Sequence, residues 1–139
     1  MTRTIDMQDI MYLNLFSKIT QVSADFCFKY NNNLMFCVDK RDLNRALGRE
    51  GENLKKLSEK MNKRIRIIAK PRGIEEARSF ISLVISPVQF KDLQITNNEI
   101  IVHSGGKQIK ATLLGRNKIR YEEMKKVVKG FFGREYRVA

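Results

Sequence analysis

The sequence predicts an α+β protein in which one order of elements, α-β-β-α-α-β, occurs twice. Apolar residues alternate between helical and strand-like spacing, and they do so in the same order in each half of the chain. A shift of 67 positions places Leu47-Gly48-Arg49 on Leu114-Gly115-Arg116. We therefore expect two modules, residues 1–70 and 71–139, each a three-stranded sheet covered by helices, packed in a fixed relation.

The first half begins with a helix predicted over residues 9–19. The side chains expected on its buried face recur at helical spacing and are Ile10, Leu13 and Phe16. Two strands follow, DFCFKY and LMFCVD, and the asparagines between them favour a tight turn. The strand KRIRIIA, residues 63–69, closes this half.

Two helices are predicted between the second and third strands of the first half. The first is short, ends at Leu47, and is expected to have Asp39 or Asp42 as its N-cap. The second covers residues 52–61. Its inward side chains are expected to be Leu54, Leu57 and Met61.

The second half repeats the order after a short joint, AKPRGIEE, residues 69–76. Its first helix is EEARSFISLVI, and the side chains expected inward are Ala77, Phe80 and Leu83. Strands VQFKDLQI and EIIVH flank an Asn-Asn turn, and the short helix GKQIKATLL follows. The loop GRNK, the helix IRYEEMKKVVKGF and the strand REYRV complete the module.

The stretch LGREGENLKKL, residues 47–57, places two glycines between two helices. Gly48 can adopt the left-handed conformation that ends the first helix. Gly51 has no side chain to keep a ligand away from the start of the second helix, where an anion is favoured. Basic residues around the loop suit a sugar-phosphate backbone, although a Gly-x-x-Gly between helices also occurs as a simple tight turn.

These residues, with the strand RIRII and the element order, resemble the KH nucleic-acid-binding module in its type II form. Two such modules in a short basic chain are similar to the archaeal homologues of the transcription termination factor NusA. The resemblance covers residues 5–138. It implies binding of single-stranded RNA, such as a nascent transcript, by a factor that acts on transcription elongation or termination, with RNA polymerase as a further partner.

The resemblance also implies roles for residues of the first module. Gly48, Arg49, Glu50 and Gly51 would form a clamp on the RNA backbone, with Glu50 part of the motif but not a contact. Arg45 and Lys55 would flank the phosphates. The apolar groove for the bases would be lined by Leu47, Leu54 and the strand around residues 65–67.

The second module departs from this pattern because Lys118 stands where the first has Gly51. Two readings stay open: a working site that replaces close backbone approach with charge, or a degenerate module that only packs. The first is favoured, and the RNA-binding residues it adds are Lys110, Gly115, Arg116, Asn117, Lys118 and Arg120. Tyr121 is the one aromatic residue considered for a base contact.

Composition and charge favour a polyanionic partner. The chain carries 27 Lys and Arg against 15 Asp and Glu, a net charge of +12. Residues 1–70 carry 14 basic and 8 acidic side chains, and residues 71–139 carry 13 and 7, so each half has a net charge of +6. We therefore expect each half to be equipped to contact RNA.

Other sequence features exclude several kinds of site. Asp6 and Asp9 interrupt the position of a secretory signal, so we expect a cytoplasmic protein without a membrane partner. Cys27 and Cys37 are expected to be buried thiols, and with only His103 beside them they cannot form an ordinary zinc site. No catalytic constellation is recognisable, so neither an enzyme, a cofactor nor a small-molecule substrate is expected.

Alternative functions stay open at this point. An rRNA-binding or ribosome-assembly protein could use the same modules, because fold does not determine the biological target. A structural adaptor could carry the positive charge without an RNA site. Double-stranded DNA is disfavoured because no helix-turn-helix recognition helix is evident, although the Leu-Gly-Arg turn between helices imitates one.

Overall fold

The computed structural model describes residues 7–139, which divide into two compact units between Lys70 and Pro71. Residues 1–6, which the sequence analysis includes in the first module, lie outside the described residues. Each unit contains one three-stranded sheet and three α-helices. The α+β class and the order of elements expected from the sequence are confirmed in both units.

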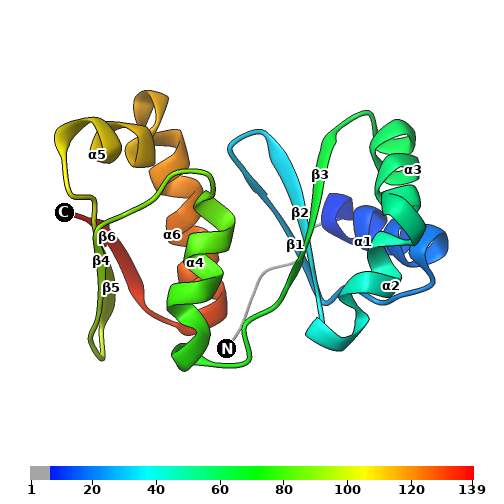
Figure 1. The fold of residues 1–139 in the computed structure, drawn as a ribbon, viewed down its shortest axis with the longest axis horizontal. Helices are drawn as coiled ribbons and strands as arrows, with labels where there is room; N and C mark the ends of the chain where they lie inside the picture. The colour runs from blue at the N-terminus through cyan, green and yellow to red at the C-terminus, as the bar shows by residue number, and fades with distance from the viewer. Residues whose placement is uncertain (1–6) are drawn as a thin grey trace. The chain divides into compact units, whose positions relative to one another are not determined.

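The first unit contains a sheet in which the middle strand has one antiparallel and one parallel neighbour. Its elements are α1 (Met7–Thr20), β1 (Phe26–Tyr30), β2 (Asn33–Val38), α2 (Leu43–Leu47), α3 (Glu52–Met61) and β3 (Arg64–Ala69). Strand β2 pairs antiparallel with β1 and parallel with β3. Since parallel neighbours need a crossover, α2 and α3 connect β2 to β3, and with α1 they lie against one face of the sheet (Figure 1).

The second unit has the same topology. Its elements are α4 (Ala77–Ile85), β4 (Asp92–Ile95), β5 (Glu99–His103), α5 (Lys107–Leu114), α6 (Ile119–Phe132) and β6 (Glu135–Val138). Strand β5 pairs antiparallel with β4 and parallel with β6. In this unit α5 and α6 form the crossover, so each unit joins its parallel strands through two helices and one intervening loop.

The core of the first unit is centred on an aromatic pair. The rings of Phe16 on α1 and Phe36 on β2 stack with their centroids 4.5 Å apart, and both side chains are fully buried. Leu57 on α3 is buried in the same cluster, and Leu47 and Leu54 on either side of the loop pack against it. The helices that carry the loop are thereby fixed to the sheet.

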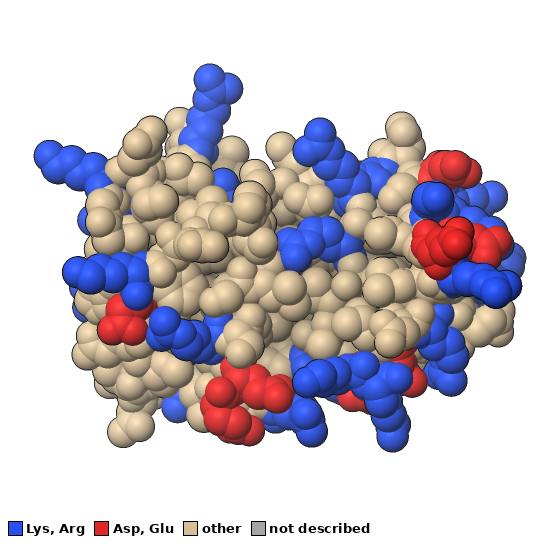
Figure 2. Space-filling view, in the orientation of Figure 1, with Lys and Arg blue, Asp and Glu red and all other residues tan. Residues whose placement is uncertain are grey.

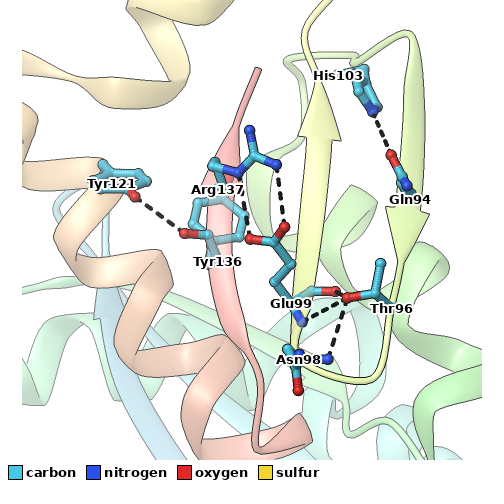
Figure 3. A network of polar contacts seen from close by, with 8 residues as sticks. All are labelled: Gln94, Thr96, Asn98, Glu99, His103, Tyr121, Tyr136 and Arg137. Atoms are coloured by element: carbon cyan, nitrogen blue, oxygen red, sulfur yellow. Dashed lines mark hydrogen bonds and ion pairs between the residues drawn. The ribbon is translucent and has the colours of Figure 1, made fainter.

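Polar contacts fix α6 to the sheet in the second unit. The Tyr121 hydroxyl donates a hydrogen bond to the backbone carbonyl of Tyr136 at 3.1 Å, and the two rings contact each other. Figure 3 shows this contact beside the ion pair between Arg137 on β6 and Glu99 on β5, whose side-chain atoms approach to 3.2 Å. Tyr121 thus attaches the first turn of α6 to β6.

Two apolar residues that the sequence analysis places inward are exposed. Ile10 is 45% exposed and Leu83 is 40% exposed, so these two predictions are wrong. Both predictions came from placing an inward side chain at every third residue. In a helix of 3.6 residues per turn, each such step rotates the side chain about 60° around the helix axis, so the end of the series leaves the buried face. Ala77 and Phe80 are buried as predicted, and Ile81, Val84 and Ile85 complete the buried face of α4.

The predicted helix cap and the predicted strand over residues 88–95 also differ from the structure. Asp39 and Asp42 occupy N-cap positions, but neither side chain makes the capping hydrogen bond. Asp42 pairs with Arg45 instead, at 3.2 Å. Strand β4 begins only at Asp92, which pairs with His103 at the end of β5, and the Lys91 amide makes the last hydrogen bond to β5, to the His103 carbonyl at 2.8 Å.

The two cysteines are buried, as the sequence indicates, and are not joined in a disulfide. The Cys27 thiol lies 3.9 Å from the backbone carbonyl of Asp9. Within residues 7–139, no three His, Cys, Asp or Glu side chains are grouped as a metal site. In the same range, the helices are too short or too polar to cross a bilayer.

Replacing the aromatic centre should destabilise the protein far more than replacing its exposed neighbour on the same helix. Phe16→Ala leaves a cavity against Phe36 and should cost about 3–5 kcal/mol of unfolding free energy. Ile10→Ala should cost under about 1 kcal/mol because the side chain is already exposed. Urea denaturation followed by circular dichroism measures both, and equal losses would contradict this account of the core.

Candidate nucleic-acid interface

The loop between α2 and α3 reverses the chain through three residues with positive φ. Gly48 has φ 80° and ψ 174°, Glu50 has φ 55° and ψ 30°, and Gly51 has φ 72° and ψ 22°. Residues 48–51 form one tight turn, in which the Gly51 amide donates to the Gly48 carbonyl at 3.2 Å. Gly48 ends α2, but in an extended positive-φ conformation and not the left-handed one predicted.

Gly48 is required for steric reasons as well. A Cβ atom at this position would lie 2.9 Å from Cγ of Asn53 and 3.0 Å from its backbone nitrogen. The Asn53 side chain in turn donates a hydrogen bond to the Arg45 carbonyl at 3.3 Å, in the last turn of α2. Sequence reasoning missed this role of Asn53, because only the folded loop brings its amide back to the preceding helix.

The loop between α5 and α6 has the same backbone path. Gly115 has φ 75° and ψ 176°, Asn117 has φ 55° and ψ 27°, and Lys118 has φ 60° and ψ 26°. The Lys118 amide donates to the Gly115 carbonyl at 3.1 Å, matching the contact in the first loop. The second loop is therefore a copy of the first in conformation, although its sequence lacks the second glycine.

The two loops differ in the side chains that pack against the first glycine. Where the first loop has Asn53, the second has Arg120, and a Cβ on Gly115 would lie 2.7 Å from Cγ of that arginine. By contrast, a Cβ on Gly51 would meet nothing within 4 Å. The space beside Gly51 is therefore open, and Lys118, at the matching position of the second loop, is exposed.

Most of the basic residues predicted at the loops are exposed. The exposed basic side chains lie on α2, α3 and α5 and in the two loops, and they are Arg45, Arg49, Lys55, Lys110, Arg116 and Lys118; Asn117 is exposed as well. Arg120 is half-buried. Figure 2 shows that Lys and Arg side chains also occur over the visible surface of both units, with Asp and Glu in smaller groups.

The charges at the first loop are partly neutralised within the protein. Arg45 pairs with Asp42 at 3.2 Å, and Lys56 pairs with Glu52 at 3.4 Å. Among residues 7–139, Arg49 has no carboxylate within ion-pair distance. Glu50 is exposed, and its carboxylate adds a negative charge to the loop.

The apolar residues predicted for a base-binding groove differ in their exposure. Leu47 and Leu54 flank the loop and are half-buried against the core. Ile65 and Ile67 are buried within the core cluster itself, beneath the helices. A base near the first loop would therefore contact the two leucines, and the isoleucines would support them from below. Tyr121 is half-buried with its hydroxyl bonded to β6, so its position serves packing.

Each loop presents exposed cations before or at the start of a helix, and the backbone at Gly51 of the first loop is open. The first turn of an α-helix presents amide groups and a partial positive charge, which favour an anion. Apart from the strand around residues 65–67, which is β3, the residues predicted in the first module lie on the α2–loop–α3 segment, and those in the second on the α5–loop–α6 segment. The chemistry available at both segments is recognition of phosphate, with apolar contact beside it.

The two glycines of the first loop should differ in their tolerance of alanine. Gly51→Ala places a side chain in open space at left-handed φ and should cost about 1 kcal/mol of stability. Gly48→Ala adds a clash with Asn53 to a backbone conformation nearly restricted to glycine, and should cost about 3 kcal/mol or more. Gly115→Ala should resemble Gly48→Ala. Thermal denaturation of the three variants measures the order, and equal losses at Gly48 and Gly51 would contradict the loop geometry.

Comparison with known proteins identifies similar chains. The protein named probable transcription termination protein NusA of Methanococcus vannielii is 27% identical over 101 residues, which is 71% of this chain and 57% of that protein. The protein of the same name from Methanocaldococcus jannaschii is 31% identical over 88 residues, 63% of this chain and 46% of that protein. The chain spans about half the length of the curated relatives it matches. No family model matches the chain.

A solved structure supports the fold over nearly the whole chain. The crystal structure of APE1850 superposes with a TM-score of 0.66 at 24% identity, covering 96% of this chain and 99% of that one. This likeness concerns the fold alone. The sequence matches to two archaeal proteins named probable transcription termination protein NusA confirm the resemblance drawn from the loop motif.

Proposed function

We propose that this chain binds single-stranded RNA through two KH modules of type II, residues 1–70 and 71–139. In this proposal it acts in the cytoplasm as a NusA-like factor in transcription elongation or termination. One observation carries the proposal. The loop between α2 and α3 and the loop between α5 and α6 each begin with a glycine, follow the same backbone path and present exposed basic side chains. Similarity to proteins named for transcription termination supports it.

The phosphates would be held where the backbone is most accessible. Gly51 faces open space, so a sugar-phosphate chain can approach the start of α3 without meeting a side chain. Arg49 and Lys55 are exposed on either side of that point and would supply charge-assisted contacts. Arg45 would contribute less, because its guanidinium already pairs with Asp42.

The bases would lie beside the loop and not upon it. Leu47 and Leu54 offer half-buried apolar surface on the two helices that flank the first loop. Single-stranded RNA can turn its unstacked bases toward such a surface, which a duplex cannot do. This arrangement favours single strands as the ligand and a nascent transcript as the biological source.

Reversing the charge of the first loop should weaken RNA binding without unfolding the protein. The double change Arg49→Asp with Glu50→Asp introduces repulsion of phosphate, and aspartate tolerates the left-handed φ at position 50. Affinity for a short unstructured RNA should fall about tenfold or more, since a charge-assisted contact contributes at least about 1.5 kcal/mol. Fluorescence anisotropy at several salt concentrations measures this, with circular dichroism as the check on folding.

A matched control tests whether total charge alone explains the loss. Lys60→Glu makes the same change in net charge at the other end of α3, about 12 Å along the helix from Glu52. Lys60 is exposed, so its replacement leaves the core intact. The RNA affinity of the Lys60→Glu variant should stay within about twofold of that of the parent protein. Equal losses in the control and the loop variant would show that binding is a diffuse charge effect and would refute the proposed clamp.

The role in transcription requires a different experiment. The full chain should be tagged, expressed in the organism that encodes it, and purified from a nuclease-treated lysate. RNA polymerase subunits should then be recovered with it in preference to ribosomal particles. Nuclease removes partners held only through shared RNA, so retained polymerase reports a protein contact. Recovery of ribosomal proteins without polymerase would favour rRNA binding or ribosome assembly instead.

A further inference from the structure

The two loops share a backbone but differ in their charge. Residues 49–52 of the first loop contain Arg49 with the acids Glu50 and Glu52, whereas residues 116–119 of the second contain two cations and no acid. We propose that the second loop, residues 115–119, makes the stronger phosphate contacts with the RNA, and that the Gly-x-x-Gly loop makes the weaker ones. This inference rests on the proposed function and assigns its two loops unequal parts.

Closely similar geometry makes the two loops directly comparable, and the largest difference is at Gly51 and Lys118, with φ of 72° and 60°. The glycine that begins each loop differs by 5° in φ and 2° in ψ between the units, from 80° and 174° to 75° and 176°. The second residue after it has φ 55° in both, and ψ differs by 3°. A difference in affinity between the loops must therefore come from side chains and not from backbone shape.

Lys118 occupies the position at which the first loop has only open space. Its φ of 60° is a conformation that a residue with a Cβ atom adopts at a cost, and that glycine adopts freely. The empty surroundings of Gly51 indicate that a side chain at this position projects away from the fold. Lys118 is exposed, so its ammonium group is available to a phosphate that approaches the start of α6.

The acids of the first loop compete with phosphate for the same place. Because Glu52 is the first residue of α3, its carboxylate lies at the positive end of the helix dipole. It also pairs with Lys56 at 3.4 Å. Glu50 adds a second exposed carboxylate within the loop. An incoming phosphate at this loop must approach two like charges.

The second loop lacks both competitors. Asn117 replaces Glu50, and Ile119 replaces Glu52 as the first residue of its helix. Ile119 is 53% exposed, which leaves an apolar side chain next to the cations where a sugar or base could rest. The carboxylates of α6 begin only at Glu122, where the pair with Lys125 lies at 3.9 Å. The side chains around residues 116–119 are thus free of acid up to that point.

The two loops serve as controls for each other in the test. The first variant, Asn117→Glu with Ile119→Glu, gives the second loop the acids of the first. The reciprocal variant, Glu50→Asn with Glu52→Ile, gives the first loop the neutral residues of the second. All four positions are exposed, and asparagine tolerates the left-handed φ at position 50. A third variant, Lys118→Gly, removes the ammonium while it relaxes the backbone.

The measurement is anisotropy of a fluorescein-labelled oligouridylate titrated with the full chain at several salt concentrations. The Asn117→Glu/Ile119→Glu variant should bind about tenfold or more weakly, and Lys118→Gly should lower the slope of log affinity against log salt by about 0.7. The reciprocal variant should bind several times more tightly than the parent. Thermal denaturation of each variant verifies folding, and Lys118→Gly should be at least as stable as the parent.

The outcomes separate the inference from the proposed function. Greater loss from Arg49→Asp with Glu50→Asp than from Asn117→Glu with Ile119→Glu would overturn the inference and leave RNA binding by the loops intact. A Lys118→Gly variant with unchanged affinity and salt slope would also overturn it. Unchanged binding by every folded loop variant would refute the proposed function together with the inference.

Discussion

The structure of each unit depends on a backbone turn that only glycine makes readily. Gly48 and Gly115 combine φ near 80° with ψ near 175°, and the following helix approaches each so closely that a Cβ atom would overlap it. This turn lets two helices fit within the crossover between parallel strands. It also sets the direction of α3 and α6, and so determines which loop residues face solvent.

Because the first glycine fixes the shape, the remaining loop positions can vary in chemistry. The second loop keeps its path with Asn117 and Lys118 in left-handed conformations, although the first has Glu50 and Gly51 there. Packing against the glycine likewise changes from Asn53 to Arg120 without altering the turn. One scaffold therefore presents two different sets of charges, and a functional difference between the units can arise without a change of fold.

Local patterns in the sequence predict the helices and strands well. They predict poorly which side of a helix is buried and which conformation a loop adopts. Strands, helices and the repeat follow from apolar spacing, which each segment expresses by itself. Ile10 and Leu83 were misplaced because a spacing of three departs from the helical period, and only the packed helix decides which side turns inward. The left-handed conformation of Lys118 and the bond from Asn53 to the Arg45 carbonyl follow from loop closure, which no local pattern encodes.

The central claim is that RNA contacts the two glycine-turned loops, and mapping of backbone amides tests it most directly. Nuclear magnetic resonance of the ¹⁵N-labelled full chain, titrated with a short single-stranded RNA, reports each amide separately. The account predicts that the largest shifts fall at residues 47–55 and 114–121, on both loops and the first turns of α3 and α6. Shifts spread evenly over basic surface residues, or concentrated away from both loops, would contradict it.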